Sequence, residues 1–110
     1  MRHKSHKFQA FVKVSPAARD ARGGSVALLP GQVRRMAILG EQHGTGRRHF
    51  FTALVTNEGD GSDWLDAGHE IVTVTIRGEE LAEYFGAGDR FTLWLGDEIA
   101  DGIVMGRAVA

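Results

Sequence analysis

The residues of this chain that could contact a nucleic acid are two pairs of arginines. The pairs are Arg34, Arg35, Arg47 and Arg48, and they lie near the two ends of a predicted hairpin. Guanidinium groups contact phosphates without regard to base sequence, so these four are candidate RNA-binding residues. The aromatic residues at 49–51 could add base stacking if they are exposed, although alternating aromatic residues in a strand more often fill a core.

Residues 44–48 (Gly-Thr-Gly-Arg-Arg) could also form an anion site, because backbone N–H groups and guanidinium groups both bind anions. Glycine loops that bind nucleotides join a strand to a helix, and no helix is expected after this segment. An exposed turn is therefore the favoured interpretation.

Trp94 is the candidate anchor for a protein partner. It alternates with Phe91, Leu93 and Leu95 in an expected strand, and successive strand residues point to opposite faces. Because those three apolar side chains belong in a core, Trp94 should face outwards. An exposed tryptophan is typical of binding hot spots. The alternative is that a loop covers it.

The other polar residues show no pattern typical of catalysis or of a metal site. The chain has no cysteine, which excludes disulfides and thiolate metal sites. No set of carboxylates at a fixed strand or helix spacing joins the histidines in a ligand set. These histidines are His3, His6, His43, His49 and His69. No Gly-x-Ser-x-Gly motif is present, and solvation of a turn accounts for Asp97, Glu98 and Asp101. We expect no enzyme, no metal and no cofactor.

Length and composition are those of a single globular domain. The chain has 110 residues, 43% of them hydrophobic and 25% charged, with a formal net charge of −1. Residues 1–57 hold 10 Lys or Arg and 2 Asp or Glu, whereas residues 58–110 hold 3 and 12. This asymmetry indicates either a basic binding face or two halves that neutralise each other after folding. No membrane helix or signal peptide is recognisable, so we expect a cytoplasmic protein.

Alternation of apolar and polar residues predicts short strands separated by glycine turns. The expected strands are 8–14, 32–39, 49–56, 71–76, 88–95 and 99–105, with a further short apolar stretch at 26–29. Residues 79–85 form the one expected helical turn. We predict a single all-β domain over residues 8–110, an antiparallel barrel or sandwich, preceded by a basic and flexible tail at 1–7.

Short motifs at the two ends of the chain resemble those of a known family. Residues 7–12 read Lys-Phe-Gln-Ala-Phe-Val, and Ala-Gly at 67–68 precedes the strand Ile-Val-Thr-Val at 71–74. Further matches lie in the last hairpin, at Gly88, Arg90, Phe91, Thr92, Leu93, Gly96, Ala100, Gly102, Ile103 and Val104. Their order and spacing resemble the third domain of elongation factor Tu, which is its C-terminal β-barrel.

The resemblance implies a six-stranded Greek-key barrel of the translation elongation factor type, so that six to seven strands are expected in all. In that family the barrel contacts the T stem of tRNA, the GTPase domain and the nucleotide-exchange factor, without catalysis of its own. This chain departs from the family at several positions. Ser25 and Val26 stand where the family has Arg and His near the tRNA, and Trp94 and Glu98 stand where it has arginines.

Two functions follow as hypotheses for a stand-alone, non-catalytic binding module. The first is contact with tRNA or another translation-associated RNA through Arg34, Arg35, Arg47 and Arg48. The alternative is a protein-interaction module that docks on a GTPase or another protein, with Trp94 at the interface. No membrane partner is expected, and the oligomeric state is not indicated.

Overall fold

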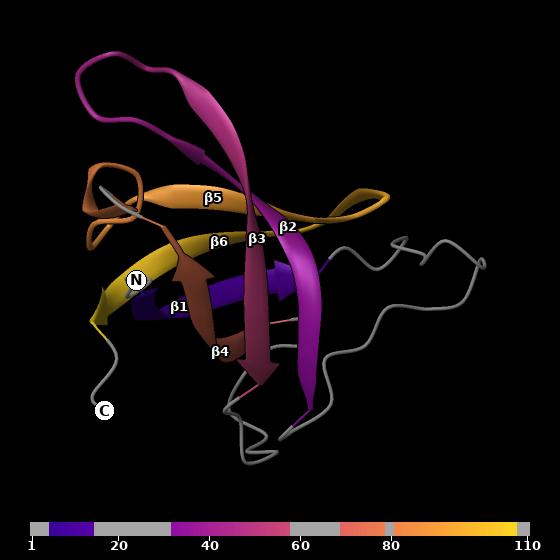
Figure 1. Cartoon of the computed structure of the whole chain (residues 1–110). Helices are drawn as coiled ribbons and strands as arrows, with labels where there is room; N and C mark the ends of the chain where they lie inside the picture. Colours follow the sequence, from indigo (N-terminus) through magenta and orange to yellow (C-terminus); the bar gives the residue numbers. More distant parts are fainter. Residues whose placement is uncertain (1–4, 15–31, 58–68, 79–80, 108–110) are drawn as a thin grey trace.

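The computed structural model describes residues 5–14, 32–57, 69–78 and 81–107 (Figure 1). These residues form six strands and one short 3-10 helix. In chain order they are β1 (Ser5–Val14), β2 (Val33–Glu41), β3 (Arg48–Asn57), β4 (His69–Arg77), η1 (Leu81–Glu83), β5 (Arg90–Leu95) and β6 (Asp97–Arg107).

The strands close into an antiparallel barrel with the order β1-β4-β3-β2-β5-β6. Strands β2, β3 and β4 follow one another as neighbours, and β1 lies beside β4, which is the Greek-key arrangement. The predicted fold class is therefore confirmed, with six strands. Figure 1 shows that the β2–β3 hairpin extends beyond the barrel wall.

Alternate residues of each strand point inwards and fill the barrel. In β1 these are Phe8, Ala10 and Val12, which are all buried as the sequence pattern predicts. The largest other fully buried side chains of the strands are Ile38, Val55, Val72, Val74, Ile76, Leu93 and Ile99. The outward positions of the same strands are therefore the ones free to bind a partner.

The N-terminal boundary of the barrel differs from the prediction. Ser5, His6 and Lys7 were expected in the flexible tail, but they form the first part of β1. The physical reason is pairing with β4, in which His6 lies opposite Ile76 and Lys7 lies opposite Thr75. Residues 1–4 and the apolar stretch at 26–29 lie outside the described residues.

The expected helical turn is present as η1. The backbone N–H groups of Tyr84 and Phe85 donate to the carbonyl oxygen of Leu81 at 3.0 and 2.9 Å. The turn directs Phe85 into the barrel, where it is buried. In the described part of the chain, no helix is long and apolar enough to cross a membrane.

Three phenylalanines pack together at the end of the barrel that η1 closes. The ring of Phe85 stacks on that of Phe8 with centroids 5.5 Å apart, and Phe91 meets Phe8 edge-on at 5.9 Å. Two glycines make room for these rings. A Cβ on Gly40 would lie 2.6 Å from Cζ of Phe85, and a Cβ on Gly102 would lie 2.5 Å from Cζ of Phe91.

Glu70 is an acidic residue on the inner side of β4. It lies two residues before the buried Val72 and therefore shares its inward orientation. Its Oε2 atom is buried and has no hydrogen-bond partner among the described residues. Burial raises the pKa of Glu70 above its ordinary value, because desolvation disfavours the charged carboxylate.

We predict that Glu70→Gln stabilises the protein at neutral pH. The raised pKa means that the folded state binds the Glu70 proton more tightly than the unfolded chain does. The free energy of unfolding therefore falls as the pH rises from the pKa of Glu70 in the unfolded chain to its pKa in the folded state. Above that pH it stays constant. Urea unfolding should show that the variant is more stable than the wild type at neutral pH. At a pH below the ordinary pKa of glutamate, the two should be equally stable. The exposed Glu98→Gln variant is the matched control, and a similar gain there would contradict the burial argument.

We also predict that Gly102→Ala destabilises the barrel. The added methyl group would meet Cζ of Phe91 at 2.5 Å and Cγ1 of Val12 at 2.9 Å, so the core must shift. Overpacking of this kind costs about 1–3 kcal/mol in urea unfolding. A Phe91→Leu change removes the close contact, so the double variant should lose less than the sum of the two single losses. If the loss in the double variant equals the sum of the two single losses, the Phe91 ring is not the cause of the destabilisation.

Candidate functional site

The four candidate arginines lie in two pairs at opposite ends of the β2–β3 hairpin. Arg34 and Arg35 are near the start of β2, whereas Arg47 is in the turn and Arg48 begins β3 opposite Glu41. At roughly 3.3 Å per strand residue, the pairs are about 20 Å apart. The structure brings each pair together but does not unite the four in one cluster.

The two arginines of the β2 pair point to opposite sides of the sheet. Arg34 shares its orientation with Met36, which is buried, and is itself partly buried. Arg35 points outwards and is exposed, as is Arg48 at the far end of the hairpin. Only one member of the β2 pair therefore lies on the same outer surface as Arg48.

The outward side of β3, β2 and β5 carries a row of apolar residues, which we call the apolar face. Its members are Ala37, Leu39, Phe50, Leu54 and Trp94. Leu39 lies opposite Phe50 on one side, and Ala37 lies opposite Trp94 on the other. Phe50 is 57% exposed and Leu54 is 41% exposed, so solvent reaches a large part of this face.

Trp94 points outwards, as its alternation with buried Phe91 and Leu93 predicts. It is half-buried, and its ring meets that of Phe50 edge-on with centroids 5.5 Å apart. Its Nε1–H donates to the hydroxyl oxygen of Thr92 at 2.8 Å. The side chain is thus held in one orientation with its polar group satisfied, which favours a pre-organised contact surface.

Sequence reasoning considered Phe50 only as a possible stacking residue and did not connect it with Trp94. The two residues are 44 positions apart in the sequence, and their contact depends on the order in which β3, β2 and β5 pair. Phe51 follows Phe50 directly and His49 precedes it, and this local sequence did not indicate which of the rings faces outwards.

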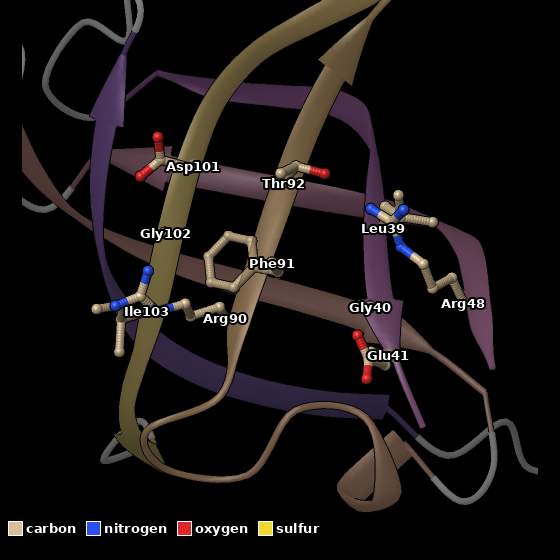
Figure 2. A pocket seen from close by; sticks show the side chains of 10 residues that line it. All are labelled: Leu39, Gly40, Glu41, Arg48, Arg90, Phe91, Thr92, Asp101, Gly102 and Ile103. Atoms are coloured by element: carbon tan, nitrogen blue, oxygen red, sulfur yellow. The ribbon is translucent and has the colours of Figure 1, made fainter. Parts of the chain in front are cut away.

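A groove of about 440 Å³ borders the apolar face (Figure 2). Residues of the β2–β3 hairpin form one wall, and residues of β5 and β6 form the other. The lining residues are Leu39, Gly40, Glu41, Arg48, Arg90, Phe91, Thr92, Asp101, Gly102 and Ile103. Leu39 lies both in the apolar face and in the groove, so the two features are continuous.

Polar contacts join the turn of the β2–β3 hairpin to the segment before β5. Nε2 of His43 lies 2.5 Å from Oδ2 of Asp89, which also accepts the backbone N–H of Gly86 at 2.7 Å. The backbone N–H of His43 donates to the carbonyl oxygen of Glu83 at 2.8 Å. These contacts dock the turn, and we call them the turn contact.

Two further histidines form structural contacts. Nε2 of His6 lies 3.3 Å from the carbonyl oxygen of Phe85, and His49 packs edge-on against Tyr84 at 5.6 Å. Within the described ranges, no group of three or more His, Cys, Asp or Glu side chains could hold a metal ion.

We predict that His43→Ala loosens the hairpin turn without unfolding the barrel. The variant loses the side-chain bond to Asp89, while Asp89 still accepts the N–H of Gly86. Because His43 is half-exposed, the free energy of unfolding should fall by at most about 1 kcal/mol. Amide hydrogen exchange at His43, which reports the bond to Glu83, should become faster. Thr45→Ala removes two side-chain bonds inside the turn, those with Gln42 and with the N–H of Arg47, and is the control. Equal exchange in His43→Ala and wild type would contradict the docking role.

No protein-family model matches this chain, and no curated protein matches its sequence. The resemblance to the third domain of elongation factor Tu therefore rests on the motifs at the two ends of the chain, and membership of that family stays a prediction. What the structure establishes is a closed, six-stranded antiparallel barrel.

Proposed function

We propose that this protein is a binding module whose partner is another protein, docked on the apolar face. The observation that carries the proposal is the pair of Phe50 and Trp94, which meet edge-on at the outer surface of the barrel. Aromatic side chains at the centre of an exposed apolar surface are typical binding hot spots.

The composition of the outer surface supports this choice. On β1 and β4 the outward positions that pair with each other are largely polar, for example Lys7 with Thr75 and Gln9 with Thr73. A barrel with a solvated surface would have the same composition on β3, β2 and β5. There, Leu39, Leu54 and Ala37 share the outward side with Phe50 and Trp94, and the polar neighbours Thr52 and Thr92 are small, which fits a surface that a partner covers.

Charged residues of both signs border the apolar face. Arg35 and Arg48 lie at its two ends, Glu41 lies opposite Arg48, and Glu98 lies opposite Trp94. An apolar centre with a charged rim is the usual anatomy of a protein interface. The rim would set orientation and association rate, whereas the aromatic pair would supply most of the affinity. A GTPase is the partner class that the resemblance implies.

RNA is the second candidate, because Arg35 and Arg48 face outwards on the same surface as the exposed ring of Phe50. Cations that flank an exposed aromatic ring bind single-stranded nucleic acid through phosphate contacts and stacking. tRNA or another translation-associated RNA is the class that the resemblance implies. Phosphate binding of this kind weakens steeply with salt.

The test of the proposed function uses capture from native cell extract, with and without RNase, followed by affinity measurement with the purified partner. We predict a protein partner whose capture resists RNase and whose affinity falls at least about tenfold in Phe50→Ser. Met105→Ser is the matched control, because Met105 is 52% exposed on β6, outside the apolar face. Circular dichroism should show that both variants remain folded.

Two results would reject the protein interface. One is an unchanged affinity in both Phe50→Ser and Trp94→Ala. The other is loss of the partner on RNase treatment, with salt-dependent binding that disappears when Arg34, Arg35, Arg47 and Arg48 are replaced by alanine. That second result would establish the RNA candidate instead. RNA affinity unchanged in the four-arginine variant would remove the arginine hypothesis.

A further inference from the structure

The barrel wall is open at the groove, where β2 and β5 both extend beyond the last residues at which they pair. The ladder between β2 and β5 runs from Ala37 opposite Trp94 to Leu39 opposite Thr92. In the same register the next pairs would be Gly40 with Phe91 and Glu41 with Arg90. The two strands do not pair there, although β2 extends to Glu41 and β5 begins at Arg90. The groove lies at these unpaired positions.

Both ends of the opening are closed by contacts. At one end the last pair of the ladder, Leu39 with Thr92, joins β2 to β5. At the other end the turn contact between His43 and Asp89 joins the two segments again. The ring of Phe85 lies directly beneath Gly40 and keeps the wall from collapsing inwards. The opening is therefore short and bounded, with room for a chain end but not for a chain that passes through.

The unpaired strand edges supply main-chain hydrogen-bonding groups. In an antiparallel strand, each residue directs its N–H and C=O to the same neighbour, and successive residues alternate between neighbours. In each strand, therefore, one of the two unpaired residues directs both groups into the opening. In β2 this is either Gly40 or Glu41, and in β5 it is either Arg90 or Phe91. Open strand edges of this kind bind extended peptides as an added strand.

The side chains around the opening differ between its two ends (Figure 2). At the Leu39–Thr92 end, the Thr92 side chain points from β5 towards β2, and the Arg48 side chain extends in the direction of Leu39. The Thr92 oxygen already accepts the indole N–H of Trp94, so its own hydrogen is left to donate. Within the described residues Arg48 forms no ion pair. A hydroxyl donor and an unpaired guanidinium together suit a carboxylate.

We propose that this groove binds the C-terminal end of a partner polypeptide, with its terminal carboxylate held by Arg48 and Thr92. The last residues of that chain lie extended between β2 and β5 and bond to their open edges. The proposal rests on the proposed function, since the groove continues the apolar face through Leu39 and the same partner would occupy both. Two carboxylates border the groove, Glu41 opposite Arg48 and Asp101 opposite Thr92, and they would repel an acidic residue upstream of the terminus.

The test uses the full chain and a display library of random short peptides with free C-termini. The best peptide is resynthesised with a free and with an amidated C-terminus, and both are titrated by fluorescence anisotropy. We predict that amidation and Arg48→Gln each weaken binding about tenfold or more, because each removes a hydrogen bond to a charged group. Arg77→Gln is the matched control, because Arg77 is exposed at the end of β4 and outside the groove, and it should change binding less than twofold. The backbone amide signals of Gly40, Glu41, Arg90 and Phe91 should shift on binding.

Failure of this proposal is distinguishable from failure of the proposed function. A library without any enriched peptide, or equal binding of the free and amidated peptides, overturns chain-end binding in the groove. If the captured protein still depends on Phe50, the apolar face stands without the groove. If free C-termini bind and depend on Arg48 while Phe50→Ser and Trp94→Ala both capture the partner normally, the groove stands and the apolar face falls.

Discussion

The packing of Phe85 against Phe8, Phe91 and the backbone of Gly40 is the interaction on which the rest of this structure depends. η1 delivers the ring to the end of the barrel, and only a residue without a side chain can lie above it at position 40. The core at this end is therefore filled by aromatic rings from β1, β5 and the turn that follows η1. The same packing lies beneath the point where the ladder between β2 and β5 ends, next to Leu39 and Thr92. One core contact thus lies at the closed end of the barrel and beside the opening in its wall.

The apolar face and the groove have a common origin in strand alternation. Each residue that enters the core sends its neighbour outwards, so buried Leu93 goes with outward Trp94 and outward Thr92. Pairing of β2 with both β3 and β5 then gathers outward residues from three strands on one surface. Thr92 links the two features chemically, because it orients Trp94 through a hydrogen bond and points into the groove. A partner that covers the aromatic pair would lie next to the open strand edges.

Much of the fold was predictable, because strands with one buried face carry a period of two that is visible in the residues. The pattern of Phe8, Ala10 and Val12 predicted β1, and the motif around Phe91 predicted the last hairpin. The start of β1 was not predictable, because Ser5–Lys7 carry no apolar alternation and become strand only through their pairing with β4. The candidate site was predicted in part. The outward orientation of Trp94 followed from alternation, whereas its contact with Phe50 and the separation of the two arginine pairs did not.

By itself the sequence determined which side of each strand enters the core, where most turns fall and which side chains are available for binding. These are local properties, set by the spacing of apolar residues and by glycines along one stretch of chain. Only the tertiary structure decided which outward residues share a surface, because that depends on strand order and register between segments far apart in the chain. The opening between β2 and β5 belongs to this second class. It arises where a ring from η1 meets a glycine of β2, and neither residue alone indicates it.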